Sequence, residues 1–261
     1  MRALCRALRV DLRRGVCSRL FLLTVVLLLA WLISNNGENL TSQMIRRTVS
    51  VAEMLNHTLI GKVSLVELVL AIASVAYGWS YCHDRACGFF PQAVARVGMP
   101  AYSRARAVSV AASAFLAGVI ALGLYLLYLT ALHLPKPDLQ TVGGHAYLDL
   151  VAQGRSGLYF VVRTVILGLT CSFAAEFGLM VTAFCPNAYM AILSPVMLYY
   201  LQRMLGMVIR MDSKWYLLRV MFGQTYDDAI QSFLWAVGYL TIGTALCGLI
   251  FCRRLRKEQV S

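Results

Sequence analysis

Charged residues are scarce in this sequence. Asp, Glu, Lys and Arg make up 14% of its 261 residues, whereas soluble domains hold about 25%. Hydrophobic residues make up 59%, which excludes a chain that buries all of its apolar surface in one water-soluble core. The composition therefore predicts an all-α membrane protein built from helices of roughly 20 apolar residues.

Lysine is rarer still, because all but four of the 24 basic residues are arginine. The net charge of +12 would indicate nucleic-acid binding in a soluble protein. Here the arginines lie beside apolar runs, which is the distribution that orients membrane proteins. No nucleic-acid partner is therefore expected.

Residue clusters that support catalysis or metal binding are also missing. Cys82, His83 and Cys87 resemble half of a metal site, but no second pair follows at a ligand spacing. The phosphate-binding pattern G-x-x-x-x-G-K-[ST] is absent, since the only Gly-Lys pair has Asn56 where the first glycine belongs. We expect no metal, no catalytic residue and no ATP hydrolysis by this chain itself.

Six apolar runs could form membrane-spanning helices, the first by including a few flanking residues. They are residues 20–33, 64–81, 107–132, 158–184, 188–209 and 233–252. No small-residue cleavage site follows the first run, so it is expected to be retained rather than removed as a signal peptide. Residues 19–261 are thus predicted to form one six-span domain.

Basic residues are divided unequally between the two sides that these spans define. The N-terminal segment, the loop 82–106 and the C-terminal tail hold fourteen bases and three acids, a net charge of +11. The opposite loops hold eight bases, seven acids and no cysteine. Because Arg and Lys accumulate in cytoplasmic loops, both termini and the loop 82–106 are predicted to be cytoplasmic.

The segment 1–18 has two stripes at helical spacing. One is apolar and the other basic: Leu4, Leu8, Leu12 and Val16 against Arg2, Arg6, Arg9 and Arg13. This pattern predicts an amphipathic helix in the membrane interface, with leucines in the acyl region and arginines toward lipid phosphates. The alternative is a basic segment that only fixes orientation and whose periodicity is accidental.

The loop 82–106 is far longer than the other inner connection, residues 185–187. Gly88 and Gly98 allow sharp turns, and Phe89 could begin a short helix with Pro91 in its first turn. A solvated loop that only sets orientation would account for the arginines but not for Phe89, Phe90 and Tyr102. The length and the aromatic residues indicate a loop that contacts a partner.

The residues 82–89 (CHDRACGF) and 96–102 (RVGMPAY) resemble the first cytoplasmic loop of type-2 ABC transporter permeases. The resemblance implies a bacterial plasma-membrane permease that pairs with a second permease and with two copies of a separate ATPase subunit, which binds ATP and Mg²⁺. It implies that the loop is a coupling helix that docks on that ATPase. The docking residues by this match are Asp84, Gly88, Arg96, Gly98, Tyr102 and Arg104, with Arg85, Phe89 and Phe90 beside them.

The resemblance carries two further expectations. Export is favoured over import on family grounds, with the substrate undefined. The segment after the fifth span is expected to fold into short helices that dip back into the membrane, at residues 215–218 and 220–222. Arg106 is a departure, since many relatives have lysine there.

Four ionisable residues lie within the predicted spans. Glu67 and Arg163 are near outer ends, where their side chains could reach the interface. Glu176 and Arg203 lie deeper and should face protein or a wet cavity, because a charge at the bilayer centre costs roughly 2.5–3.5 kcal/mol. They could line a substrate path or a dimer interface, or they could make structural hydrogen bonds.

The main alternative to the permease is an ATP-independent secondary transporter or another multi-span membrane protein. A secondary transporter predicts internal repeats with broken helices at corresponding positions. No clear repeat is visible, since Pro195 in the fifth span has no counterpart in the second. A membrane-embedded enzyme would need clustered nucleophiles or ligands.

Overall fold

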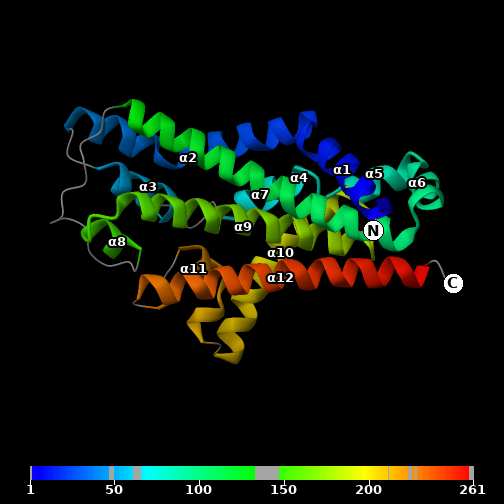
Figure 1. Cartoon of the computed structure of the whole chain (residues 1–261). Coiled ribbons are helices and arrows are strands. Elements are labelled where there is room, and N and C mark those ends of the chain that lie inside the picture. Colours follow the sequence, from blue (N-terminus) through cyan, green and yellow to red (C-terminus); the bar gives the residue numbers. More distant parts are fainter. Residues whose placement is uncertain are drawn as a thin grey trace.

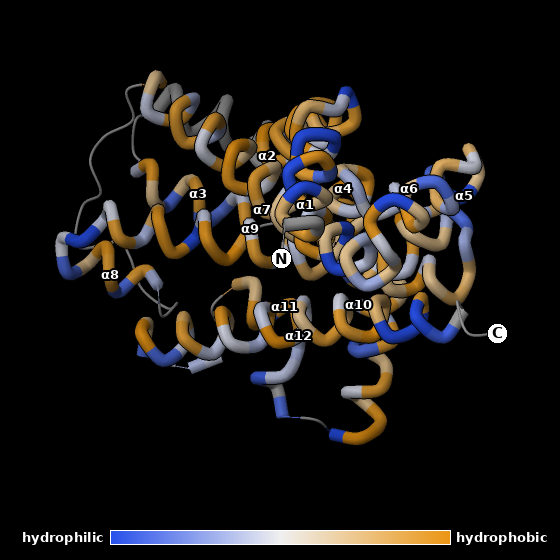
Figure 2. The backbone as a smooth tube through the Cα atoms, turned by 45° about the vertical axis from the view of Figure 1, so that its right-hand side comes forward, coloured by the Kyte–Doolittle hydropathy of each residue, from blue (hydrophilic) through white to orange (hydrophobic). Residues whose placement is uncertain are grey.

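A computed structural model describes residues 2–46, 50–60, 66–132, 147–210, 212–222, 225–226 and 228–258, and within these ranges every regular element is helical. Long helices run side by side, and the short helices α5 (Ser80–Ala86) and α6 (Phe89–Val97) lie at the same end as both termini (Figure 1). Helices α3 and α8 lie at the opposite end. Hydrophilic segments gather in α1, in α5 and at the end of α12, while the middle of the bundle is hydrophobic (Figure 2).

In the described part of the chain, four helices are long and apolar enough to cross a membrane. They are α7 (Met99–Ala131), α9 (Ser156–Thr182), α10 (Ala188–Ile209) and α12 (Ala229–Glu258). Helices α1 (Arg2–Val16) and α2 (Arg19–Arg46) form a fifth candidate together, bent by 51° where they meet. The predicted all-α fold with several apolar spans is confirmed, but the described residues contain four or five such helices, so the prediction of six is not confirmed.

The second predicted span, residues 64–81, is not one continuous helix. Helix α4 (Val66–Val75) ends after ten residues, and a turn leads into α5 (Ser80–Ala86). The hydroxyl of Ser74 donates to the carbonyl oxygen of Ala174, and a side chain at Gly78 would meet the carbonyl oxygens of Ser74 and Ala175 at 2.8 and 3.3 Å. The chain turns here because its backbone lies directly against α9.

The predicted N-terminal helix is present as α1. Its leucine side is half-buried against α7 and so is only partly available to lipid, while Arg6, Arg9 and Arg13 are exposed. Gly15 brings α1 to within van der Waals distance of Tyr77 and Ser113. The bend into α2 is fixed by the Ser18 hydroxyl, which donates to the Gly15 carbonyl and accepts from the backbone N–H of Phe21.

Helix α3 (Val51–Ile60) lies in the segment expected to be an outer loop. Met54 and Leu55 are fully buried, and the Thr58 hydroxyl lies 2.7 Å from that of Tyr125 on α7. The side-chain amide of Asn35 donates to the Thr58 carbonyl oxygen at 2.8 Å. A short amphipathic run of this kind falls below the length of a span, so the sequence did not reveal it as part of the core.

Short helices follow α10, as expected after the fifth span. They are the 3₁₀ turn η2 (Ser213–Trp215) and α11 (Leu217–Phe222). Leu217, Val220 and Phe222 are buried against the bundle. Their position relative to the lipid stays a prediction. Two other short elements, α6 (Phe89–Val97) and α8 (Leu148–Ala152), complete the set.

Small residues let the central helices approach closely. Gly118 of α7 faces the Cα of Gly168 on α9, and the Ser172 hydroxyl donates to the Ala111 carbonyl oxygen at 2.9 Å. Helices in a membrane associate through such close packing, because lipid supplies no hydrophobic drive between them. The pair α7–α9 therefore forms the centre of the bundle.

A methyl group at Gly178 of α9 would overlap the carbonyl oxygen of Ala191 on α10. We expect Gly178→Ala to lower stability by about 1–3 kcal/mol, the usual cost of overpacking. Thermal unfolding in detergent measures this. The matched control is Gly123→Ala on α7, where a methyl group would meet no atom within 4 Å. Equal effects of the two substitutions would contradict the close approach of α9 and α10.

Candidate functional site

The segment 82–106 folds into a compact helical unit, which we call the α5–α6 unit. It contains most of α5, all of α6 and the first two turns of α7. Gly88 and Gly98 have φ angles of 68° and 83° and form the turns on either side of α6. These are conformations that glycine adopts at low cost. The expected turns and the short helix that begins at Phe89 are therefore present.

Asp84 is the centre of a buried ion network. One of its carboxylate oxygens accepts from a guanidinium nitrogen of Arg14 at 3.2 Å. The other accepts from Arg106, and from the Tyr102 hydroxyl at 3.1 Å. Asp84 is 1% exposed, so α1, α5 and α7 meet at a carboxylate that is out of contact with solvent.

Arg106 extends the network to two further residues. Its guanidinium donates to the Tyr77 hydroxyl at 2.7 Å, and its Nε lies 3.6 Å from a carboxylate oxygen of Asp11. The guanidinium also lies over the rings of Tyr77 and Tyr102, with 5.1 and 5.2 Å to the ring centroids. Arg106 is fully buried, and a buried cation needs such partners to offset its lost hydration.

The network is close to charge balance, with two arginines facing two aspartates. Asp11 lies on α1, before the first long apolar helix. Burial raises the pKa of Asp11 above its usual range, although the Arg106 and Arg14 guanidinium groups lower it. The interaction with cations therefore only partly offsets the desolvation of this carboxylate.

The nine residues assigned to docking separate into two groups. Asp84 and Tyr102 are buried in the ion network, and Phe90 lies edge-on between the rings of Tyr81 and Tyr102, at 5.5 and 5.4 Å. The other group lies on the surface or at the turns of the unit: Arg85, Gly88, Phe89, Arg96, Gly98 and Arg104. The first group holds the unit on the bundle, and the second forms the face that a partner could touch.

Side chains next to the ion network also contact two of the exposed docking residues, Phe89 and Arg85. The guanidinium of Arg14, which also binds Asp84, lies over the Phe89 ring at 4.7 Å. The Arg85 guanidinium donates to the Tyr81 hydroxyl at 3.1 Å. The exposed residues at the start of α6 are therefore positioned by side chains of α1 and α5.

The half-site of Cys82, His83 and Cys87 is not gathered around one point. The Cys87 sulfur lies 3.7 Å from Nε2 of His83, but Cys82 is buried while both of these residues are exposed. No group of three or more His, Cys, Asp or Glu residues able to hold a metal occurs in the described part of the chain.

Glu176 and Arg203 lie in different surroundings. Glu176 is 1% exposed and faces α12, where a side chain at Gly248 would meet its carboxylate at 3.5 Å. Among the described residues, no basic side chain forms an ion pair with it. Arg203 is on the exposed side of α10, beside a cavity of about 240 Å³ that Tyr216 and Arg219 also line.

The expectation that Arg163 reaches toward the interface is wrong. Its side chain is 1% exposed and turns inward, where it donates to the Phe222 carbonyl oxygen at 3.1 Å and to the Asn56 side-chain oxygen at 3.0 Å. It also lies over the rings of Tyr147 and Tyr159. Because α3 and α11 supply these acceptors, only the tertiary structure could reveal this site.

Comparisons with known proteins add no further assignment, because no family model, no curated protein and no solved structure matches this chain. The resemblance of the segment 82–106 to permease loops therefore stays a prediction from the sequence.

We predict that Asp84→Ala lowers stability by about 3–5 kcal/mol, because it leaves Arg106 buried with only the more distant Asp11 as a counter-charge. The double variant Asp84→Ala/Arg106→Met should lose less, since both buried charges are then gone. Unfolding in detergent measures these differences. The control Arg104→Met removes an exposed arginine from α7, the helix that also carries Arg106. Its stability should stay within about 0.5 kcal/mol of the parent protein. A double variant as unstable as the single one would contradict the pairing.

Proposed function

We propose that this chain is the membrane-spanning permease subunit of an ATP-driven transporter, and that the α5–α6 unit docks on a separate ATPase subunit. The observation that carries this proposal is the contrast within the unit. Its one acidic residue, Asp84, is paired within the buried network, while Phe89, Arg96 and Arg104 stay on the surface. The exposed face is therefore purely cationic with an aromatic residue, and it suits an acidic partner groove.

A docking unit that drives transport must pass movement to the membrane helices. Three aromatic contacts support this role: Phe90 packs on Tyr81 and on Tyr102, and Tyr81 packs on Phe251 of α12 with 5.6 Å between ring centroids. Together with the ion network, these contacts tie α6 to α1, α5, α7 and α12. Displacement of α6 by a partner would therefore shift several helices at once, because packed side chains deform little.

The rest of the assembly follows from the same proposal. ATP and Mg²⁺ bind to the partner, because this chain lacks the phosphate-binding pattern. A second permease completes the path, and the substrate leaves the cell across a bacterial plasma membrane. Both termini and the α5–α6 unit face the cytoplasm, in agreement with their basic residues.

The secondary-transporter alternative is less well supported by the helices. That class uses helices broken at corresponding positions in two halves of the chain. Here α4 ends at Val75, whereas α10 continues through Pro195. The break beside Gly78 has no partner in α10, and it leads directly into the docking unit.

The proposal is tested by purification of the tagged chain in mild detergent. We expect a soluble subunit with a Walker A motif in stoichiometric amount. Arg96→Glu/Arg104→Glu should weaken its binding by more than about tenfold, since like charges that face each other across an interface cost several kcal/mol. The charge-matched control is Arg155→Glu/Arg210→Glu, which changes two exposed arginines away from the α5–α6 unit.

Membrane insertion and the elution profile of each variant are compared with those of the parent, so that loss of binding is separated from loss of folding. Unchanged binding by a well-folded Arg96→Glu/Arg104→Glu variant would refute the docking role. A chain that purifies alone, from membranes without added ATPase activity, would refute the permease assignment.

A further inference from the structure

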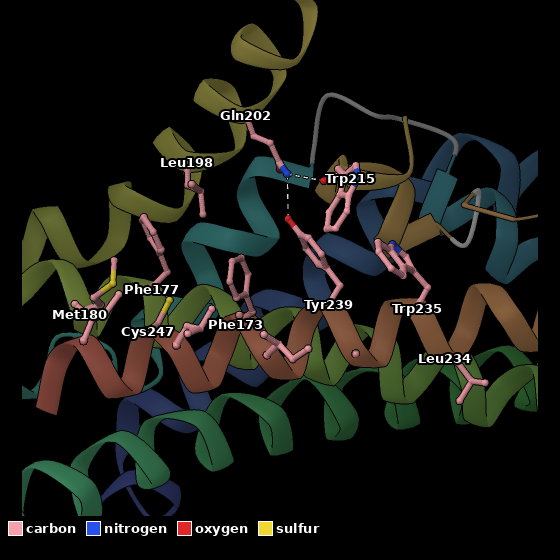
Figure 3. A pocket seen from close by; sticks show the side chains of 15 residues that line it. Phe173, Phe177, Met180, Leu198, Gln202, Trp215, Leu234, Trp235, Tyr239 and Cys247 are labelled. Atoms are coloured by element: carbon pink, nitrogen blue, oxygen red, sulfur yellow. Dashed lines mark hydrogen bonds between the residues drawn. The ribbon is translucent and has the colours of Figure 1, made fainter. Parts of the chain in front are cut away.

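A large apolar groove lies between α10 and α12, with α9 as its floor. Its volume is about 690 Å³, within the range of about 300–1,000 Å³ that is typical of ligand sites. Phe173, Phe177 and Met180 form the floor, and Leu198 lies on the wall that α10 provides (Figure 3). The wall on α12 runs from Leu234 to Ile250, which is about 24 Å at 1.5 Å per residue.

The part of the groove toward Leu234 is crossed by a set of hydrogen bonds and aromatic contacts. The Gln202 side chain donates to the Tyr239 hydroxyl at 3.0 Å and to the Trp215 carbonyl oxygen at 2.6 Å, which bridges α10, α12 and η2 (Figure 3). The Trp215 and Trp235 rings pack edge-on with centroids 4.8 Å apart. The bridge therefore crosses the groove from α10 to α12 near the end that lies away from the termini.

The other end of the groove leads to basic residues. The lining positions of α12 recur every three or four residues through Leu246, Cys247 and Ile250. The same spacing continues to Arg253 and Arg254, which are exposed. One turn of helix therefore separates the hydrophobic lining from two cationic side chains.

We propose that this groove binds an anionic membrane lipid, with an acyl chain along α12 and the headgroup at Arg253 and Arg254. The lining is almost wholly apolar, and basic residues at a membrane surface attract anionic headgroups. The chain end lies beneath Trp215. This inference is independent of the proposed ATPase partner, because every residue that carries it belongs to α9, α10, η2 and α12.

A helix from a second copy fits the groove less well. A helix that crosses the bilayer is about 10–12 Å wide with its side chains, and it would have to pass the bridge between Gln202 and Tyr239. An acyl chain is narrow and ends within the membrane. The bridge across the groove and the exposed arginines at its other end therefore favour lipid as the occupant.

Gly238 provides a variant that fills the groove. It is a lining residue, and a side chain there would meet no atom within 4 Å. Gly238→Phe thus places a ring in the groove from a Cβ position that has open space. The matched control is Gly123→Phe on α7, which has equally open surroundings and does not line the groove.

The test uses the full chain in phosphatidylcholine nanodiscs with a trace of photoreactive lipid. The probe is phosphatidylglycerol with a diazirine in its acyl chain, and phosphatidylcholine with the same chain is the comparison. We expect phosphatidylglycerol to label α10 and α12 at the groove, as mapped by mass spectrometry. Gly238→Phe should abolish this label, and Gly123→Phe should retain it.

Arg253→Gln/Arg254→Gln should remove the preference for phosphatidylglycerol, a change of about 25-fold if each arginine contributes about fivefold. These residues are exposed, so this variant keeps the test valid even if Gly238→Phe misfolds. Equal groove labelling by the two lipids in the parent protein would overturn the proposal. So would the absence of lipid labelling together with disulfide formation between two copies of a Leu246→Cys variant, since a second chain would then occupy the groove.

Discussion

The guanidinium of Arg106 is buried in the protein interior, and the packing at the end that holds both termini depends on this buried charge. A fully buried guanidinium requires counter-charges and hydrogen-bond acceptors. Asp84, Asp11 and the Tyr77 hydroxyl supply them from α5, α1 and the turn after α4. Three parts of the chain that are distant in sequence, namely α1, the turn before α5 together with α5, and α7, are thereby held around one side chain.

This constraint also determines which residues a partner can reach. Asp84 and Tyr102 are hydrogen-bonded to each other within the ion network, and the Phe90 ring packs on the Tyr102 ring. What stays on the surface of the α5–α6 unit is cationic, with Phe89 stacked beneath Arg14. A rigid, one-signed face fixed to several membrane helices is the physical basis for the proposed docking role.

The opposite side of the bundle has a different character. Helices α10 and α12 pack on α9 but are joined to each other mainly by Gln202, Tyr239 and η2. Between them, apolar side chains line a groove of about 690 Å³, and α12 ends in arginines. The helices at the end with the ion network are therefore joined by several ion pairs and hydrogen bonds, while the groove is open to the lipid that surrounds a membrane protein.

The sequence by itself determined the all-helical class with several apolar helices long enough to span a membrane, the amphipathic helix α1, the glycine turns around α6 and the approximate limits of α7, α9, α10 and α12. These features depend on local composition and periodicity, which hydropathy and turn chemistry report directly. The tertiary structure alone decided that α4 is short, that α3 enters the core and that Arg163 turns inward. It also decided that Asp84 forms an ion pair with Arg106. Each of these depends on which backbone or side chain another segment brings within a few ångströms, and no local pattern in a single sequence contains that information.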